Sequence, residues 1–263
     1  MAGLKIVKVS QGFEWVDLDI CLDTVENHSV LVSDNRAEDE GNCLLITKTA
    51  REELFSFIHW QNQDTRENRV EQGGLMAGHH YRVPGTGEKI SVVAHVFPLY
   101  TAKGDPGFWN ATAQDWKLGY DAMHRMAIET GKALDVIGWF HTHPNGLPTF
   151  MSGTDRDTMS KNFYSENNYA LVLNPHTGSW KGFRSAAVVD ADCCMLDTDD
   201  LQRLCVREER RAGQPPAVQE DKALAKKPRK KKDKQKKAEK KAKKSKLWKK
   251  RKKAIQRKRS ARK

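Results

Sequence analysis

The sequence VIGWFHTHP, residues 136–144, decides the fold of this 263-residue chain, because it is an apolar run that ends in two histidines. Side chains two residues apart on an extended strand point to the same side, roughly 6–7 Å apart along the backbone. If this stretch forms a buried strand, His141 and His143 can bind one ion. A lone His-x-His pair is more often a surface or core feature than a metal site, so this interpretation depends on the residues around it.

A Ser-x-x-Asp pattern follows, formed by Ser152 and Asp155. The pattern is typical of a helix N-terminus, where the serine caps the helix and the aspartate compensates the helix dipole. We expect a helix to begin at Ser152 and to hold Asp155 rigidly, while the preceding Pro/Gly loop folds it back towards the histidines. Two imidazoles and a carboxylate suit Zn²⁺, and three protein ligands leave a fourth tetrahedral position for water, as in catalytic zinc sites.

A third motif lies upstream, in the sequence EQGGLMAG of residues 71–78. Taken alone, Glu71 would be an ordinary exposed loop acid. Together, Glu71, the HTHP of residues 141–144 and the Ser-x-x-Asp of residues 152–155 resemble the JAMM (MPN+, Prok-JAB) family of zinc metallopeptidases. Eight residues separate the second histidine from the serine, one more than in the family pattern, so the loop between them has to bulge.

The resemblance implies an α/β fold of the JAB/MPN type, with a mixed β-sheet flanked by helices. It also implies roles for five residues. Zn²⁺ would be held by His141, His143 and Asp155, and a zinc-bound water would be activated by Glu71, which later protonates the leaving amine. Ser152 would donate a hydrogen bond to the developing oxyanion.

The function implied by the resemblance is hydrolysis of peptide or isopeptide bonds at the C-terminus of ubiquitin or a ubiquitin-like modifier. Residue types and spacing alone support only metal-assisted hydrolysis. Two alternatives remain open. One is a non-catalytic MPN-type scaffold, although such a relative would normally lack one or more of the five residues. The other is a nucleic-acid-associated protein that acts through its C-terminal tail.

The charge of the chain is divided unevenly. Residues 222–263 carry 25 Lys and Arg residues against two acidic ones, a net charge of +23, whereas the rest of the chain carries −11. A segment this basic and this poor in apolar residues cannot bury enough surface to fold, so we expect a disordered tail. Such a tail can bind nucleic acid by neutralising phosphates, can bind an acidic partner, or can act only as a solubilising or localising extension.

Composition also indicates the compartment. The five cysteines form no C-x-x-C pair, and an odd number that includes a vicinal pair favours a reducing environment over a disulfide framework. The N-terminus has no long apolar segment, and no stretch of 18 uninterrupted apolar residues occurs. We therefore expect a cytoplasmic protein with no membrane partner.

We expect three regions: an N-terminal β extension (residues 1–42), the JAMM/MPN-like metallopeptidase domain (43–205), and a linker with the basic tail (206–263). Alternation and apolar runs predict strands at 4–9, 14–20, 29–32, 44–47, 90–97, 134–140, 169–173 and 180–189. Capping patterns predict helices that start after Thr49, cover 112–130 and end at Gly131, and run from Ser152 to about residue 163.

Several other segments are predicted to be irregular or without a metal role. Adjacent side chains on a strand point to opposite faces, so His79 and His80 are not expected to share one ion. His176 is expected in an exposed turn. Turns or loops are predicted at 26–27, at 83–89 (a hairpin turn, since it lacks the Gly-Lys-Ser/Thr ending of a phosphate loop) and at 98–110, and a last amphipathic turn near 201–205.

Overall fold

Strand β4 (Gly73–Arg82) has three neighbours in the main sheet of the computed structural model, which describes residues 15–37, 41–61 and 67–205. It pairs antiparallel with β5 (Lys89–Pro98) along its length and antiparallel with β8 (Asp135–Thr142) over Gly73–Gly78. Its last residues pair parallel with the short β1 (Val16–Asp17). Strand β4 therefore joins β5 and β8, which are separated in the sequence by α3, into one sheet.

Seven strands of this nine-stranded mixed sheet, β4 among them, form a closed ring, and β1 lies outside it. From β5 the order continues through β3 (Asn42–Ile46), β11 (Val189–Leu196), β10 (Trp180–Arg184) and β9 (Tyr169–Leu173) to β8, which pairs back with β4. Strand β2 (Ser29–Val32) pairs with β11 outside the ring. A separate two-stranded sheet consists of β6 (Lys103–Asp105) and β7 (Phe108–Asn110). The predicted α/β domain with a mixed sheet is confirmed, and the sheet is a closed barrel.

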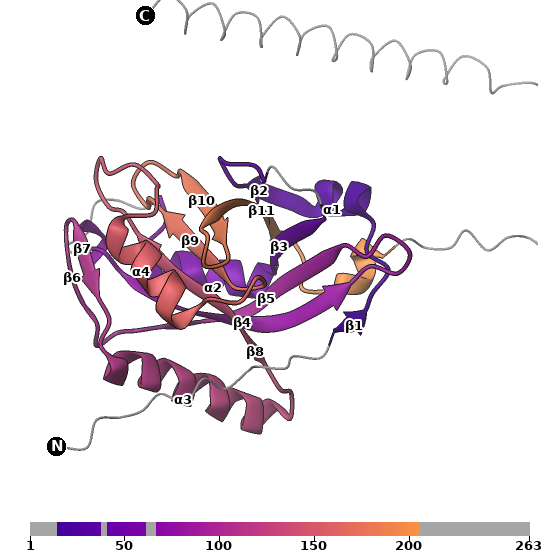
Figure 1. The fold of residues 1–263 in the computed structure, drawn as a ribbon, viewed down its shortest axis with the longest axis horizontal. Helices are drawn as coiled ribbons and strands as arrows, with labels where there is room; N and C mark the ends of the chain where they lie inside the picture. The colour runs from indigo at the N-terminus through magenta and orange to yellow at the C-terminus, as the bar shows by residue number, and fades with distance from the viewer. Residues whose placement is uncertain (1–14, 38–40, 62–66, 206–263) are drawn as a thin grey trace, which may run out of the picture. The chain divides into compact units, whose positions relative to one another are not determined.

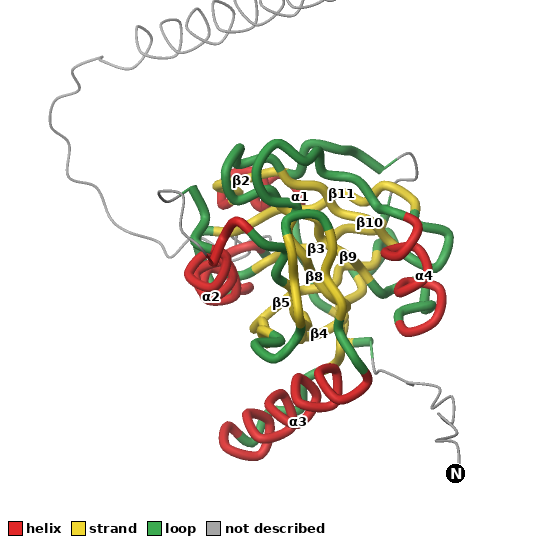
Figure 2. The backbone as a smooth tube through the Cα atoms, turned by 90° about the vertical axis from the view of Figure 1, so that its left-hand side faces the viewer, coloured by secondary structure: helices red, strands yellow, loops and turns green. Residues whose placement is uncertain are grey.

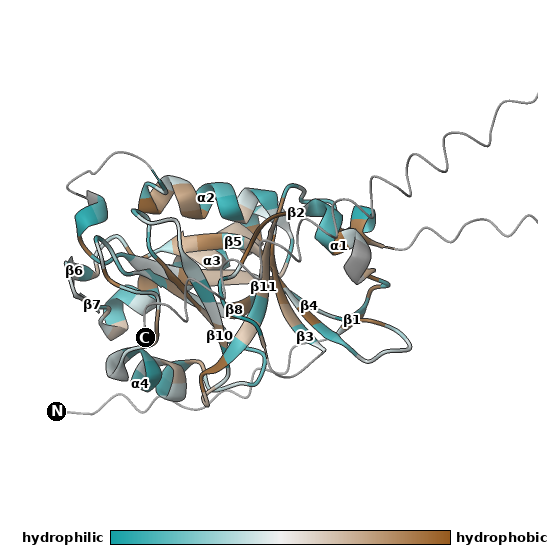
Figure 3. Ribbon diagram, turned by 90° about the horizontal axis from the view of Figure 1, so that it is seen from above, coloured by the Kyte–Doolittle hydropathy of each residue, from teal (hydrophilic) through white to brown (hydrophobic). Residues whose placement is uncertain are grey.

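Helices surround the strands on several sides (Figures 1 and 2). Figure 3 shows α2 and α4 on opposite sides of strands rich in hydrophobic residues. No helix within the described ranges is both long and apolar enough to cross a membrane. The helices are α1 (Leu22–His28), α2 (Lys48–Ile58), α3 (Ala113–Thr130) and α4 (Gly153–Asn162), with short 3₁₀ turns η1 (Glu67–Arg69) and η2 (Leu201–Leu204).

Burial on both faces explains the continuous apolar runs of the strands. On β9, Tyr169 and Leu171 pack in one core cluster with Leu54 and Ile58 of α2. The alternate residue Val172 packs in a second cluster, which also receives side chains from α3 and α4. Since successive strand residues point to opposite faces, a strand with both faces covered carries apolar residues at every position.

Many sequence predictions are confirmed. Strands β2 and β9 have the expected bounds, and the turn at 83–89 joins the β4–β5 hairpin. The turn predicted near the end of the domain is η2. Helix α3 begins after a capping box formed by Thr112 and Asp115 and ends at Gly131, whose φ of 67° is left-handed.

Five predictions of elements are wrong. Residues 26–27 lie within α1. Of the predicted strand at 14–20 the structure describes residues 15–20, and among these only Val16–Asp17 forms a strand. The predicted loop at 98–110 contains the β6–β7 hairpin, and the predicted strand at 180–189 is broken by a turn, after which β11 begins at Val189.

The fifth concerns the start of α2, whose N-cap is Thr47 instead of Thr49. The Thr47 side chain accepts a hydrogen bond from the backbone N–H of Ala50. Thr49 makes a tertiary contact instead, because its hydroxyl and its backbone N–H both donate to the carboxylate of Asp199.

The predicted strand at 4–9 and the basic tail lie outside the described residues. The proposed boundaries of the three regions stay a prediction.

Candidate metal centre

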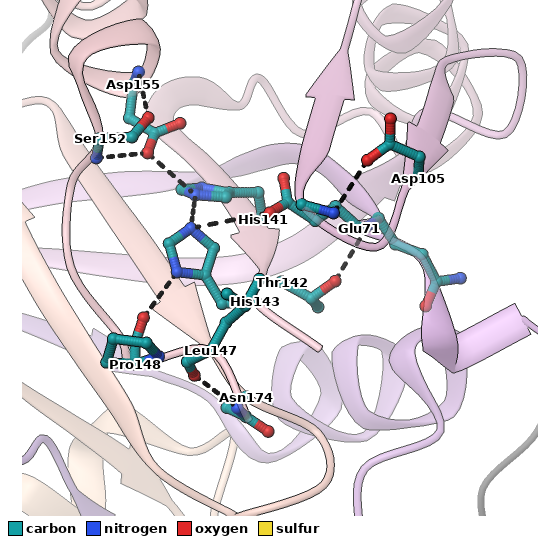
Figure 4. A network of polar contacts seen from close by, with 12 residues as sticks. Glu71, Asp105, His141, Thr142, His143, Leu147, Pro148, Ser152, Asp155 and Asn174 are labelled. Atoms are coloured by element: carbon teal, nitrogen blue, oxygen red, sulfur yellow. Dashed lines mark hydrogen bonds and ion pairs between the residues drawn. The ribbon is translucent and has the colours of Figure 1, made fainter. Parts of the chain in front are cut away.

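The end of β8 and the start of β4 are held in register at the candidate site. Gly73 pairs with His141, and the preceding residue, Gln72, is bound twice by Thr142. The Thr142 backbone N–H donates to the Gln72 carbonyl at 2.8 Å, and the Gln72 N–H donates to the Thr142 hydroxyl oxygen at 2.9 Å (Figure 4). Strand pairing therefore brings Glu71, which precedes Gln72, next to the two histidines.

The two histidines and Asp155 converge on one point (Figure 4). The Nε2 atoms of His141 and His143 lie 3.1 Å apart, and His141 Nε2 lies 3.4 Å from Asp155 Oδ2. Ligands held about 2.0–2.1 Å from a tetrahedral zinc ion are separated by about 3.3 Å. The donor set and its spacing therefore fit a divalent metal of this kind, and these three residues form a candidate metal-binding group.

Asp155 is oriented by the helix that it helps to begin. Ser152 is the N-cap of α4, and the two residues form a capping box: the Asp155 N–H donates to Ser152 Oγ and the Ser152 N–H donates to Asp155 Oδ2 at 2.7 Å. Burial alone would raise the pKa of the Asp155 carboxyl, but contacts with His141 and Ser152 outweigh it and hold the pKa well below its usual range. The carboxylate is thus ionised and available to a cation.

His143 is fixed by the loop that follows it. Its Nδ1 lies 2.7 Å from the carbonyl oxygen of Pro148, which can only accept, so Nδ1 carries the proton and Nε2 is left with a lone pair. Burial, with the nearby His141, lowers the pKa of the imidazole below its ordinary value. The ring is therefore neutral near neutral pH, as a metal ligand has to be.

A buried asparagine and a histidine hold this loop in turn. Asn174 donates through Nδ2 to the carbonyl oxygens of Leu147 at 2.8 Å and Asn145 at 3.1 Å. His176 Nδ1 accepts from the Asn145 N–H at 2.6 Å, and its Nε2 lies 3.0 Å from Asn68 Oδ1. The prediction of an exposed His176 is therefore wrong: the side chain is half-buried and supports the loop.

Glu71 lies beside the metal-binding group in a buried position. Its Oε1 is 4.0 Å from His143 Nε2, and its side chain is 7% exposed. Burial raises the pKa of the carboxyl to about 7, although the nearby His141 acts in the opposite direction. The backbone is held by the β6–β7 hairpin, because the Glu71 N–H donates to the carbonyl oxygen of Asp105 at 2.8 Å. Glu71 is therefore not the ordinary exposed loop acid that it would be taken for without the other two motifs.

A small cavity of about 90 Å³ opens at the centre. Its polar wall includes Glu71, His143, Ser152 and Asp155, so four of the five predicted site residues line it. The Nε2 atom of the fifth, His141, lies 3.1 Å from that of His143. The apolar wall comes from the β6–β7 hairpin and from the loop before α4. The apolar lining residues are Phe108, Trp109, Leu147 and Phe150.

The neighbouring histidines of β4 lie apart from this group, as expected. His80 is buried and its Nδ1 lies 2.9 Å from Ser91 Oγ, while His79 lies near Asp135 at the other end of the β4–β8 pairing. Sequence reasoning missed the supporting residues Asn174 and Asp105. No motif marks them, because each acts through a backbone contact made possible only by the fold.

The closed mixed barrel and its convergent side chains define the class, an α/β domain with a candidate metal-binding group and a buried acid beside it. Residues 54–167 match the family described as JAB1/Mov34/MPN/PAD-1 ubiquitin protease, and this segment contains all five predicted site residues. This match supports the assignment to the JAB/MPN family that the motifs indicated. A search of curated proteins gave no match to the chain. The family fits both a ubiquitin-related peptidase and a scaffold.

Proposed function

We propose that the protein is a zinc-dependent peptidase or isopeptidase that hydrolyses the bond at the C-terminus of ubiquitin or a ubiquitin-like modifier. The observation that supports this most strongly is the position of Glu71. Its carboxylate is buried beside His143 and opens on the same cavity as the metal-binding group. A scaffold has no need for an acid at this position, since burying a carboxylate is costly.

The three residues His141, His143 and Asp155 would hold the metal. A zinc ion bound there supplies Lewis acidity that polarises the scissile carbonyl and lowers the pKa of water. Glu71, with a pKa raised by burial towards neutrality, is suited to accept a proton from the attacking water and to return it to the leaving amine. A carboxyl whose pKa lies near neutral pH can both accept a proton and donate it at that pH.

Ser152 would stabilise the negative charge that develops on the carbonyl oxygen. In the capping box its Oγ acts as an acceptor for the Asp155 N–H, so the hydroxyl proton can be donated to a group in the cavity that Ser152 lines. A donor aimed at the developing oxyanion lowers the barrier more than it strengthens substrate binding. The apolar wall would exclude bulk water from the reacting groups.

The test uses the full chain and two substitutions at the centre. Modifier conjugates and precursor fusions are incubated with the wild-type protein, with and without a chelator, and bound metal is measured by elemental analysis. Glu71→Gln is expected to retain about one metal ion per chain while kcat falls by about 10²- to 10⁴-fold, because it removes a general base and no ligand. His143→Ala is expected to lose the metal.

An exposed glutamate on α3 provides the matched control. Glu129→Gln should leave both metal content and kcat unchanged, because Glu129 is exposed and lies outside the cavity. Near-normal turnover by Glu71→Gln would show that another group is the base. A wild-type protein that binds zinc and cleaves no member of the panel would favour the scaffold, and one that binds no zinc would overturn the proposal.

A further inference from the structure

The imidazole of His141 lacks the partner that usually orients a metal-binding histidine. Such residues almost always donate their second ring N–H to a carboxylate, a carbonyl or a water, which fixes the ring. His143 follows this rule through Pro148. The Nδ1 of His141 is buried and has no hydrogen-bond partner among the described residues, although the residue is only 1% exposed. No side chain or backbone group among the described residues therefore orients this ring through Nδ1.

An indole ring lies against that imidazole. Trp139 is two residues before His141 on β8, so both side chains point to the same side of the strand. Their ring centroids are 4.7 Å apart and their planes differ by 12°, a stacked arrangement. This contact restricts rotation of the imidazole about its Cβ–Cγ bond, the same motion that a hydrogen bond at Nδ1 would restrict.

Trp139 is itself held from several sides. Its Nε1–H donates to the sulfur of Met159 on α4 at 3.0 Å, and its ring is 1% exposed. Trp109 of β7 stacks with it at 6.0 Å and 11°, and Trp116 of α3 meets it edge-on at 6.4 Å and 83°. Contacts from α4, β7 and α3 therefore fix the indole, and the imidazole of His141 packs against this fixed ring.

A glycine makes room for this arrangement. A Cβ on Gly73, which pairs with His141 in the β4–β8 register, would lie 2.7 Å from a ring carbon of Trp109. Trp109 also lines the cavity, and its hairpin binds the backbone of Glu71. The same hairpin thus contacts both the proposed base and the ring that stacks on the metal ligand.

We propose that Trp139, supported by Trp109, is a positioning residue that holds the imidazole of His141 in its metal-binding orientation in place of a hydrogen bond at Nδ1. The inference rests on the proposed function, because it takes His141 to be a metal ligand. In this proposal, the stacking of Trp139 on His141 orients the imidazole before the metal binds. Replacing the indole should weaken metal binding even when the fold is kept.

The test compares the zinc affinity of full-length variants by competition with a chelator, after metal removal and reloading. Trp139→Leu keeps an apolar side chain and removes the flat ring, so its zinc affinity should fall by about 10- to 100-fold, the usual loss when support of a ligand is removed. Trp139→Phe restores a flat ring and should recover most of the affinity. Trp116→Leu removes an aromatic ring from the same cluster without touching the stacked face, and should bind zinc within about twofold of wild type.

A thermal melt of each metal-free variant shows whether it is folded. Equal zinc affinity in Trp139→Leu and wild type would overturn the inference, as would an equal loss in Trp116→Leu, which would mean that general packing is responsible. If Trp139→Leu does not fold, a measurement on the wild-type protein tests the inference instead. Nuclear Overhauser contacts between the His141 imidazole and the Trp139 indole should be present both without and with zinc. Their absence from the metal-free protein would overturn the inference.

These outcomes separate the inference from the function on which it rests. A wild-type protein that binds no zinc contradicts the proposed function, whatever the Overhauser contacts show. A wild-type protein that binds zinc as tightly as Trp139→Leu contradicts only the role of the stack.

Discussion

His143 donates a hydrogen bond from Nδ1 to the carbonyl oxygen of Pro148, five residues further along the chain, at 2.7 Å. The loop that carries Pro148 therefore selects the tautomer that leaves Nε2 facing the metal-binding group. The loop also has one residue more than the motif pattern, and within it Asn145 has a left-handed φ of 58°. Asn tolerates this conformation better than most residues. The orientation of a metal ligand thus depends on how well this loop is held.

Substitution of Asn174 should loosen that loop. Asn174 is fully buried and binds the carbonyl oxygens of Asn145 and Leu147, so Asn174→Ala leaves two partly buried carbonyl oxygens without this donor. We expect a loss of about 1–3 kcal/mol in the free energy of unfolding. We also expect zinc affinity to fall by about tenfold or more, because the orientation of His143 is disturbed. Urea unfolding and chelator competition measure the two effects.

Asn168 provides a control of the same residue type. It is buried and donates to the carbonyl oxygen of Val136, at the end of β8 away from the histidines. Asn168→Ala should lose a similar amount of stability and keep its zinc affinity. Equal losses of affinity in both variants would show that destabilisation alone weakens the centre.

Gly104→Ala should displace the backbone of Glu71. A Cβ on Gly104 would lie 1.9 Å from the Glu71 carbonyl oxygen. Either the β6–β7 hairpin or the backbone at Glu71, just before β4, therefore has to move. We expect kcat to fall by about tenfold or more with metal content unchanged, and stability to fall by about 1–3 kcal/mol. Gly107→Ala in the same hairpin meets no atom within 4 Å and should behave as wild type. Unchanged kcat in Gly104→Ala would mean that the backbone position of Glu71 is not critical.

Ser152→Ala separates the two roles of this serine. Loss of the N-cap should cost about 1 kcal/mol of stability, and loss of the oxyanion donor should lower kcat by roughly ten- to a thousandfold with little change in KM. Thr112→Ala removes the matching capping box of α3 and should lower stability alone. Kinetics run beside thermal melts distinguish the variants. If Ser152→Ala loses stability while kcat stays normal, Ser152 is only a cap.

The pair formed by His95 and Glu53 should make stability depend on pH. Its atoms His95 Nδ1 and Glu53 Oε1 are 2.9 Å apart, and this hydrogen bond raises the pKa of His95 above its ordinary value. A raised folded-state pKa stabilises the fold below the unfolded value of about 6.5, and this contribution is lost as the pH rises through the folded value.

The expected result for Glu53→Gln is therefore a deficit in the free energy of unfolding at pH 6 that shrinks by pH 9. The deficit should be about 1 kcal/mol or less, because both side chains are partly exposed and the interaction is screened. Urea unfolding at both pH values measures it. Since Glu53 also accepts from the Val96 N–H, a deficit of equal size at both pH values would assign the effect to that hydrogen bond instead.

Removal of residues 214–263 tests the basic tail. We expect the melting temperature and the cleavage of a small substrate to change little, and nucleic-acid binding to weaken or disappear. Binding by the full chain should fall steeply with salt, because phosphate contacts release counterions. Measurements of both proteins at low and high salt decide the matter. A marked rise in activity on truncation at low salt would show that the tail covers the active site.

Local signals in the sequence predicted the elements that they specify. The caps at Thr112 and Ser152 and the apolar run of β9 lie where expected, because a helix cap and a buried strand are each specified by residues that are close in the sequence. The break between β10 and β11 could not be predicted in this way. Its turn contains Ser185 and Val188 in left-handed conformations, with φ of 63° and 54°, and no Gly, Pro or Asn marks it.

In the candidate site, too, the sequence predicted some residues and missed others. His141, His143, Asp155, Ser152 and Glu71 could be proposed because motif spacing relates them, and the structure brings them together. The residues that support them could not. Asp105 reaches Glu71 through a hairpin that was predicted to be a loop, and Asn174 acts on backbone carbonyls from beyond the end of β9. Such contacts depend on which distant segments of the chain pair, and alternation within one strand does not specify its partner.

The closed ring of strands limits which parts of the chain can fold alone. Strand β11 is the element that joins β3 to β10, so the barrel closes only when the segment ending at Leu196 is in place. The matching segment, residues 54–167, carries all five site residues but lacks β3, β9, β10 and β11. Pairing such distant segments requires unfavourable loop closure before contacts compensate it. We therefore expect that the motif-bearing segment does not fold alone, and that a nascent chain assembles its candidate metal centre only after nearly the whole domain has been synthesised.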